Sequence, residues 1–430
     1  MKFHEEPARQ TPVVDECDVL VAGGGPAGVA AALAAAWSGA RVCLLEVHGC
    51  LGGVWTAGLL TWILDKDNKP GVMARILAEL DARGARNLSN AYDTEVMKRI
   101  LEQLCCEAGV DIRLHTRVVD VGSDALNRLS LVVTESKSGR EAWKARVFVD
   151  CTGDGDLAKL AGCKFAVGRE PTGETQPMTL MSLLSGVRYQ DLHARRICRG
   201  PGVSNVESKE VLLRELERAS ASPSYALPTL FPIREDLFGF MANHVYGRSG
   251  LNAQDLTDAT LAAREEIHAQ VQALRQLGGV WKNLQIVATG EQIGVREGRR
   301  IRGRYTVTAD DLRTGRLHED AVCRVTFHVD VHTTNPDRSG NKSVDAQEFQ
   351  SRPYDIPYRA LLAKDVDGLL LAGRCISGDF LAHSSYRVTG NAVAMGQAAG
   401  IAAALACKLE KLPHELDWNG ELLQGLNRLD

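Results

Sequence analysis

The order of apolar and polar positions predicts strands and helices that alternate through the amino-terminal part of the chain. Short apolar runs predict strands at 18–22, 41–46, 110–114, 117–121, 129–134 and 143–150. Helical spacing predicts helices at 26–38, 70–82 and 93–108, each followed by a glycine that ends it. Near the carboxyl end, the same patterns predict a buried strand at 367–372 and a closing helix at 392–409.

Strands that alternate with helices predict an α/β fold with a parallel sheet. Glycine and alanine are concentrated at 22–36 and 390–406, where small side chains let backbone or a ligand come close. The middle of the chain, 163–350, is more charged and less repetitive. We therefore predict one Rossmann-like domain that is built from both ends of the chain and is interrupted by an inserted α+β domain.

Composition narrows the class of protein. With 45% hydrophobic and 24% charged residues, the 430-residue chain is typical of a globular protein. A net charge of -4 gives no electrostatic footprint for nucleic acid or an anionic membrane. The polar start of the chain lacks an apolar signal core, and no uninterrupted apolar stretch of about 18 residues predicts a membrane span. Eleven scattered cysteines without a CxxC pair argue against a zinc site or a thiol redox motif, so we expect a cytoplasmic protein with reduced thiols.

A dinucleotide fingerprint follows the first predicted strand. Gly23 permits the tight turn, Gly25 lets a pyrophosphate approach the backbone, and Gly28 lets helix and strand pack closely. The helix amino terminus offers free N–H groups to the phosphates. Glu46 ends the next strand, where an acidic group accepts a hydrogen bond from a ribose hydroxyl.

Three further segments favour FAD over NAD. The segment 48–56 carries paired glycines, Gly52 and Gly53, directly after the acidic residue. A second close backbone approach there suits a ligand that continues past the pyrophosphate, as FAD does. The segments 150–156 and 367–374 each place glycine at the end of a predicted strand, where they can contact the same ligand.

These motifs resemble those of the FAD-dependent oxidoreductases of the glutathione-reductase-like two-dinucleotide-fold class, which are akin to fumarate-reductase-type flavoproteins. The resemblance covers most of the chain and rests on DVLVAGGGPAGVAAALAAA, LGGVWTAGL, DCTGDGDLA, GVREGRRIRGRY and AGRCISGDFLAHSSYRVTGNAVAMGQAAG. It implies an FAD-binding domain made of 1–162 and 354–430, with a substrate domain at 163–353 that caps the flavin.

The resemblance also implies which residues bind FAD. The pyrophosphate would lie at Gly23, Gly25, Pro26, Ala27 and Gly28. In the adenosine half, the ribose would lie at Glu46, the adenine edge at Val118, and the rest at Thr152, Gly153 and Asp154. In the flavin half, the ribityl chain and flavin would lie at Gly52, Gly53 and Thr56, the ribityl phosphate at Gly373 and Arg374, and the pyrimidine end of the flavin at the helix start by Asn391 and Ala392. Independently of the family, free N–H groups at a helix start stabilise the negative charge of a reduced flavin.

Departures from related patterns limit the chemistry. A disulfide reductase of this class has two cysteines five residues apart, whereas here Cys50 is followed five residues later by Trp55. Flavin monooxygenases usually carry Gly-Asp before the last helix, where this chain has Gly373 and Arg374. The chain has no second strand–GxGxxG–helix unit for a nicotinamide. We therefore expect electrons to come from, or go to, a substrate or an unknown separate donor or acceptor.

Two segments offer groups for proton transfer and substrate binding. A predicted strand at 328–332 places His328, Asp330 and His332 on one face, where the outer histidines lie about 13 Å apart and are too far apart to share a metal ion. We therefore predict no metal site there, and His332 is either a proton-transfer residue beside Asp330 or part of a half-buried polar face.

The second segment, 383–387, follows the strand that ends at Gly373, at the edge of the sheet where α/β proteins bind ligands. Here Arg387 could clamp a carboxylate or an oxyanion, and His383, with Tyr386 as a second choice, could move a proton. The alternative is a loop that these side chains hold together. For the basic run 296–304 we expect internal salt bridges near the domain junction.

Together these features predict an FAD-dependent dehydrogenase or reductase. It would transfer hydride between flavin N5 and a small polar substrate, such as a sugar or a carboxylated metabolite. An FAD monooxygenase or oxidase is one alternative, and a flavin-binding electron-transfer subunit is another. We expect a small-molecule substrate as the partner, no nucleic acid and no membrane, and leave open whether the chain forms a homo-oligomer.

Overall fold

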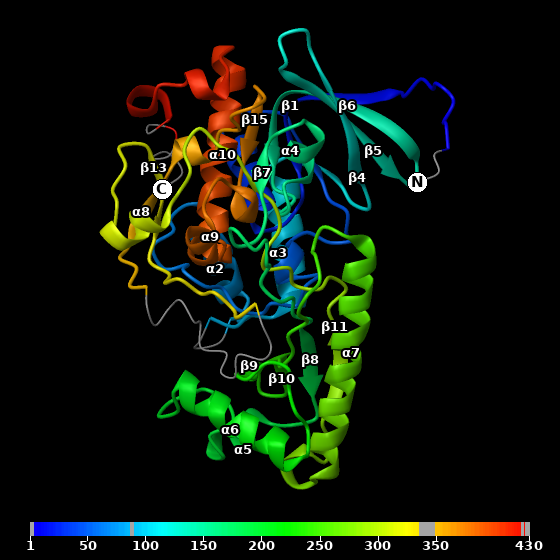
Figure 1. The fold of residues 1–430 in the computed structure, drawn as a ribbon, viewed down its shortest axis with the longest axis vertical. Coiled ribbons are helices and arrows are strands. Elements are labelled where there is room, and N and C mark those ends of the chain that lie inside the picture. The colour runs from blue at the N-terminus through cyan, green and yellow to red at the C-terminus, as the bar shows by residue number, and fades with distance from the viewer. Residues whose placement is uncertain (1–3, 87–89, 335–348, 423–424, 426–430) are drawn as a thin grey trace.

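The computed structural model describes residues 4–86, 90–334, 349–422 and 425. The predicted parallel sheet is present and is the framework of the main unit (Figure 1). Its parallel strands are β3 (Asp111–Arg113), β2 (Val42–Leu45), β1 (Val13–Ala22), β6 (Gly139–Asp150) and β15 (Leu369–Leu371), in that order across the sheet. The carboxyl ends of these strands meet at one edge, so the segments that follow them are brought together.

Two further predicted strands extend this sheet by antiparallel pairing. β4 (Arg117–Ser123) and β5 (Leu129–Ser136) pair antiparallel, and β5 pairs antiparallel with the first half of β6. The predicted parallel sheet therefore has an antiparallel extension, in which β5 runs against β6 while β4 runs in the same direction as β6. The reason is the length of the connections, because residues 124–128 and 137–138 are too few to carry the chain back for a parallel crossover.

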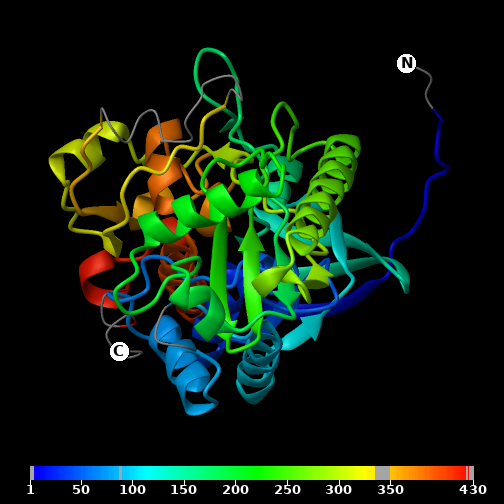
Figure 2. The ribbon, with the colours of Figure 1, turned by 90° about the horizontal axis from the view of Figure 1, so that it is seen from below.

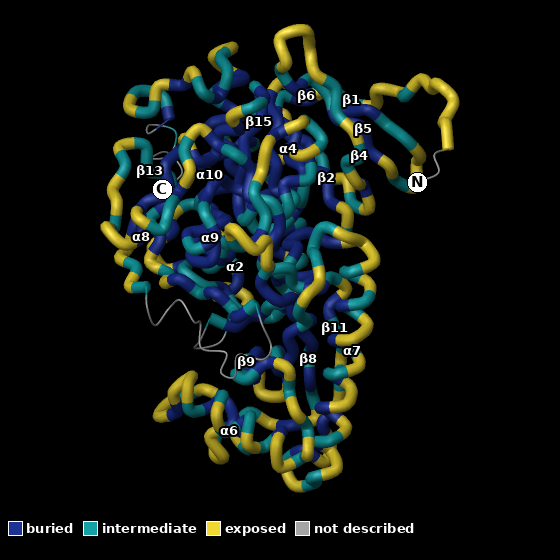
Figure 3. Tube along the Cα trace, viewed as in Figure 1, coloured by how far each residue is buried: buried dark blue, intermediate teal, exposed yellow. Residues whose placement is uncertain are grey.

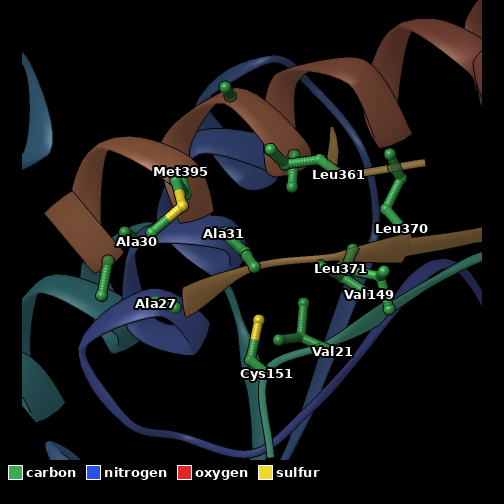
Figure 4. Packing of buried hydrophobic residues seen from close by; sticks show 14 of the residues in the cluster. Val21, Ala27, Ala30, Ala31, Val149, Cys151, Leu361, Leu370, Leu371 and Met395 are labelled. Atoms are coloured by element: carbon green, nitrogen blue, oxygen red, sulfur yellow. The ribbon is translucent and has the colours of Figure 1, made fainter. Parts of the chain in front are cut away.

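The helices of the main unit cover the sheet and carry most of its core. α1 (Pro26–Trp37) and α10 (Thr389–Leu409) pack on each other, and α2 (Val72–Ala82) and α3 (Thr94–Glu107) lie beside α1. Small side chains dominate the contact, with Ala27, Ala30 and Ala31 of α1 in the same buried cluster as Met395 of α10 (Figure 4). Both helices therefore start at the same edge of the sheet as the strand ends.

A second unit, here called the cap unit, consists of a four-stranded antiparallel sheet and three helices. The sheet runs β11 (Gln285–Thr289), β8 (Ser182–Ser185), β10 (Leu237–Met241), β9 (Thr229–Arg234), and the helices are α5 (Tyr189–Ala194), α6 (Asn205–Arg218) and α7 (Ala253–Gln276). Seen from below, its green segments lie in front of the blue and orange segments of the main unit (Figure 2). An α/β fold with an inserted α+β unit is thus present.

Shorter elements complete the chain. They are α4 (Asp156–Leu160), β7 (Phe165–Ala166), β12 (Arg300–Ile301), α8 (Ala309–Thr314), β13 (Ala321–Val325), β14 (Tyr354–Pro357) and α9 (Phe380–Tyr386), with short helical turns η1 (Gly53–Trp55), η2 (Gly279–Trp281), η3 (Tyr358–Ala360), η4 (Gly373–Cys375), η5 (Pro413–Glu415) and η6 (Trp418–Leu422).

The buried residues show which parts of the chain belong to each core. Figure 3 shows the densest burial around α10 and β15 in the main unit. The two cores of the cap unit are built from buried residues between Met178 and Ile293. Buried residues from Ile301 to Val331 contribute to the main core instead. The boundaries 163 and 353 stay predictions about the folding units.

One described helix, α10, is long and apolar enough to cross a membrane by length and composition. Its most apolar window is 78% buried inside the protein. This helix packs on α1 and the sheet. The core helix of a globular protein can have the same length and apolar composition as a membrane span.

The crossing of α1 and α10 depends on two glycines. A Cβ at Gly396 would lie 2.1 Å from the carbonyl oxygen of Ala27, and a Cβ at Gly400 would lie 2.2 Å from that of Ala31. Both distances are far inside van der Waals contact with backbone atoms, which cannot move independently of α1. The helices run side by side in the same direction, since Gly396 faces Ala27 and Gly400, one turn later, faces Ala31.

We expect Gly400→Ala to lower the free energy of unfolding by about 1–3 kcal/mol, because the added methyl group overpacks the helix contact. In an ordinary helix interior, the same change would raise the free energy of unfolding by about 1 kcal/mol. Thermal and denaturant unfolding of the FAD-loaded protein measure the difference. The control is Ala394→Gly, at a half-buried position of α10, which should cost no more than about 1 kcal/mol. A Gly400→Ala protein that is more stable than wild type would contradict this account of the crossing.

Candidate active site

A cavity lies at the carboxyl edge of the parallel sheet and brings together most of the predicted FAD residues. Its lining includes Gly23, Gly25, Pro26, Ala27, Glu46, Gly53, Val118, Thr152, Gly153, Gly373, Arg374 and Ala392. Five predicted residues do not line it: Gly28, Gly52, Thr56, Asp154 and Asn391. The segments involved come from both ends of the chain.

The glycines of the fingerprint have the local roles that the spacing predicts. Gly23 has φ +96°, and a Cβ there would lie 2.6 Å from the carbonyl oxygen of Cys151. A Cβ at Gly28 would lie 1.7 Å from the carbonyl oxygen of Gly23, so only glycine permits this close turn. At Gly25 a Cβ would meet nothing within 4 Å, which leaves open space beside the backbone at the helix start.

The amino terminus of α1 is a free binding surface for anionic groups. Gly25 is its N-cap, and no side chain of the described residues caps it. Pro26 has no N–H, so Ala27 and Gly28 supply the first two N–H groups that lack an intrahelical acceptor. These donors and the helix dipole suit a pyrophosphate.

Glu46 lies at the end of β2 and is 4% exposed. Its carboxylate accepts hydrogen bonds from the backbone N–H groups of Gly24, at 2.5 Å, and His48, at 2.8 Å. It therefore holds the glycine turn to the segment after β2 while it lines the cavity. The sequence motif predicts a ribose contact but gives no sign of this second role.

The paired glycines after β2 shape the cavity from the other side. A Cβ at Gly53 would lie 3.1 Å from the Cα of Gly25, so the two backbones face each other closely. Gly52 has φ +107° and packs on Thr56, whose hydroxyl donates to the carbonyl of Leu51 at 2.6 Å. Gly52 and Thr56 thus build the turn that positions Gly53.

The segment after β6 meets the segment after β15. Arg374 donates from Nη2 to Oδ1 of Asp154 at 2.6 Å, and Gly153 lies against the same guanidinium. Thr152 accepts from the N–H of Asp156 and is held by the buried carboxylate of Asp150. Burial raises the pKa of Asp150 to about 6, although three N–H and O–H donors stabilise its charged form.

The first turn of α10 closes the cavity. The helix begins at Thr389 with no side-chain cap, so it starts three residues before the predicted 392. Ala392 lines the cavity, whereas Asn391 is fully buried and its amide oxygen accepts from the Cys323 thiol. Thr389 is buried, and among the described residues its hydroxyl has no partner. Sequence reasoning missed Thr389, although the TGNA motif, which begins with this residue, could have indicated it.

A second cavity, of about 380 Å³, lies between the main unit and the cap unit. Four residues line both cavities: Val54, Arg374, Arg387 and Thr389. The second cavity therefore opens on the end of the first where the flavin is expected. Its volume is in the range of small-molecule sites.

Arg387 is the predicted catalytic residue that lies at this junction. Its Nη2 donates to the backbone carbonyl of Asp330 at 2.9 Å and to Oε1 of Gln176 at 3.4 Å, and the Asp330 carboxylate is 3.7 Å away. The side chain is 12% exposed, and burial lowers its pKa. Arg387 is therefore held in place with part of its guanidinium facing the cavity.

His332 lines the second cavity together with His328 and Asp330. Its Nε2 lies 3.3 Å from Oδ2 of Asp330, and its backbone N–H donates to Gln176 at 3.0 Å. Burial, together with the charge of Arg296, lowers the pKa of His332 to about 4 although Asp330 acts against this. The imidazole is therefore neutral near pH 7 and able to accept a proton.

The prediction of a strand at 328–332 is wrong, although its three polar residues do share one cavity. β13 ends at Val325 because the next two N–H groups, of Thr326 and Phe327, donate to the Asp65 carboxylate instead of to a strand. Alternation persists beyond this point, since Val329 and Val331 are buried in the main core.

The other two predicted catalytic residues lie away from both cavities. His383 is fully buried in α9, edge-on to the ring of Tyr386 at 5.6 Å, and burial lowers its pKa well below the usual value. The Tyr386 hydroxyl donates to the carbonyl of Ile376 at 3.0 Å. Among the described residues, neither lines a cavity with Arg387, so the structure gives both a position in the core.

The basic run divides into two kinds of arginine. Arg299, Arg300, Arg302 and Arg304 pair with Asp156, Glu297, Asp365 and Asp367, as expected for internal salt bridges. Arg296 instead lines the second cavity, as does Lys209 of α6. Sequence reasoning missed both cations, because nothing in their local sequence distinguishes them from surface charges.

These features define a flavoprotein of the dinucleotide-binding class. The open space at Gly25, the uncapped starts of α1 and α10, and the unpartnered Thr389 hydroxyl fit FAD. A sequence profile of the family described as FAD dependent oxidoreductase matches residues 18–426. The chain belongs to this family of enzymes, and FAD is its cofactor.

The chain is also similar to solved structures. One is a geranylgeranyl bacteriochlorophyll reductase-like protein from Thermoplasma acidophilum, with 15% identity and a TM-score of 0.49 over 96% of this chain and 83% of that one. Another is a flavin-dependent brominase, with 13% identity and a TM-score of 0.47 over 96% and 83%. A third is an anhydrotetracycline hydroxylase from Streptomyces rimosus, with 15% identity and a TM-score of 0.42 over 91% and 62%.

We expect Glu46→Ala to weaken FAD binding by roughly 10- to 100-fold, because it removes a charged acceptor that orders the glycine turn. Fluorescence titration of the apoprotein with FAD measures the dissociation constant. Glu46→Gln keeps one acceptor oxygen and should lose less. An alanine variant that binds FAD as tightly as wild type would contradict the role given to Glu46.

Proposed function

We propose that the enzyme is a dehydrogenase or reductase that acts on a small polar substrate in the second cavity. The observation that carries the proposal is the shared lining of the two cavities at Val54, Arg374, Arg387 and Thr389. A substrate bound against Arg387 would lie next to the flavin end of the cofactor site. A sugar and a carboxylated metabolite are the two substrate classes that we consider.

When bound, FAD supplies the two-electron chemistry, by taking hydride at N5 or giving it from N5. Arg387 would orient the substrate by binding a carboxylate or by stabilising an oxyanion. His332 would accept the O–H proton of an alcohol as it is oxidised, and would donate a proton in the opposite direction. Gln176 bonds to both residues through one oxygen, so it would fix their relative positions.

Two further parts of the proposal concern kinship and setting. We place the protein with the glutathione-reductase-like flavoproteins that are akin to fumarate reductases, on the motifs quoted above. We also place it in the cytoplasm, with a small molecule as its partner. Because both the cap unit and the main unit line the site, closure of one unit on the other would exclude water from the reaction.

The test is anaerobic bleaching of the yellow holoenzyme by a panel of sugars and hydroxy acids. We expect one class of compound to bleach the flavin and NADPH not to do so. Arg387→Ala should keep its flavin but bleach at least 100-fold more slowly, because the substrate loses its clamp. The matched control is Arg313→Ala, at an exposed arginine on α8, which should bleach at the wild-type rate.

Other outcomes would replace this proposal. Bleaching by NADPH with oxygen uptake would assign a monooxygenase, and oxygen uptake with a substrate alone would assign an oxidase. Reduction only by a partner protein would assign an electron-transfer subunit. A wild-type bleaching rate in Arg387→Ala would remove Arg387 from the site.

The lowered pKa of His332 predicts the pH dependence of the oxidising direction. The neutral imidazole is the active form, so the rate of bleaching should be level above about pH 5 and fall as pH drops through about 4. Stopped-flow bleaching across pH measures the profile, with flavin release monitored to show that the protein stays loaded. His332→Gln should be slow and lack this fall. A midpoint near the ordinary histidine value of about 6.5 would contradict the assignment.

A further inference from the structure

The second cavity carries more positive than negative charge. Of the described residues that line it, Lys209, Arg296, Arg374 and Arg387 are cationic, whereas Asp330 is the one carboxylate. Arg374 is neutralised by Asp154, which lies outside this lining. The remaining three cations share Asp330, which also interacts with His332.

Arg296 lies in the cavity without a carboxylate of its own. One guanidinium nitrogen, Nη1, donates to the carbonyl of Pro177 at 2.7 Å and to the hydroxyl of Thr179 at 2.8 Å. Among the described residues, no carboxylate lies within ion-pair distance. Desolvation and the nearby charge of Arg387 lower its pKa to about 10. These two bonds, one to a backbone carbonyl and one to a side-chain hydroxyl, fix Nη1 and leave the other guanidinium nitrogens available to a ligand.

Lys209 approaches the same cavity from α6 of the cap unit. No hydrogen bond or ion pair joins its ammonium group to the part of the chain that the structure describes. Burial lowers its pKa, and the attraction of Asp330 acts against that. Lys209 is half-buried, whereas Lys282 of the same unit is exposed to water.

Positive charge held away from water is costly unless an opposite charge compensates it. Asp330 compensates one of three cations, so an anion in the cavity would be attracted to the rest. A guanidinium fork and an ammonium group that line the same cavity suit the two oxygens of a carboxylate. The remaining walls include Trp62, Tyr225, Phe231 and Met241, which suit a short carbon skeleton.

We propose that the substrate is a carboxylate, held by Arg296 and Lys209 on the cap side of the cavity. This inference rests on the proposed function, which places the substrate there, and it selects the carboxylated class over neutral sugars. The carboxylate group would anchor the molecule away from the flavin and present the rest of it to Arg387 and His332. Arg296 and Lys209 thereby become specificity-determining residues.

Calorimetric titration of the holoenzyme with succinate, succinamide and inorganic phosphate tests the proposal without turnover. We expect succinate to bind at least tenfold more tightly than the uncharged succinamide. Lys209→Met should weaken succinate binding at least tenfold and leave succinamide unchanged. Lys282→Met, at an exposed lysine of the cap unit, is the matched control and should bind succinate as wild type does. Arg296→Gln provides a second variant, with flavin content and thermal unfolding as checks on its fold.

Equal binding of succinate and succinamide would overturn the proposal, as would wild-type succinate binding in both Lys209→Met and a folded Arg296→Gln. If phosphate binds more tightly than succinate and this binding is lost in Lys209→Met, the carboxylate proposal is overturned and the substrate class is assigned as a phosphate. Anaerobic bleaching separates these failures from failure of the proposed function. If a neutral sugar bleaches the flavin, the proposed dehydrogenase function stands and the proposed carboxylate substrate is overturned.

Discussion

The packing of α1 on α10 is the contact on which the rest of the structure depends. Gly396 and Gly400 let the backbone of one helix lie on the carbonyl groups of the other, which joins the two ends of the chain. Because the helices run in the same direction, their free amino termini open at the same edge of the sheet. FAD, which has a pyrophosphate in the middle of the molecule and a charge-accepting ring at one end, can use both.

The cap unit adds to this framework a cavity whose chemistry comes from distant parts of the chain. Gln176 joins Arg387 to the segment that holds His332, and Arg296 and Lys209 enter from the cap side. Asp330 lies among these cations beside His332, which burial and the charge of Arg296 keep neutral. Such a balance of charges depends on burial, since in water the same groups would be screened and nearly independent.

Much of the fold could be predicted because the signals are local. Apolar runs and glycine stops predicted the strands and helices around the fingerprint, including Pro26 as the first residue of α1. The pattern did not indicate how every strand pairs or where each strand ends. β4 and β5 run antiparallel, and β13 ends where Asp65 takes the N–H groups of the next residues. Hydrophobic periodicity shows neither the direction of a strand nor a side chain that accepts hydrogen bonds in place of a neighbouring strand.

By itself, the sequence determined the glycine turn, the acidic residue after β2 and the dinucleotide class, because each depends on steric limits within a few residues. Only the tertiary structure decided that Arg387 and His332 face the cavity while His383 and Tyr386 lie in the core. It also separated Arg296 from four neighbouring arginines that pair with carboxylates. The physical reason is that desolvation and charge pairing depend on what surrounds a side chain in space, and those surroundings come from segments far apart in the chain.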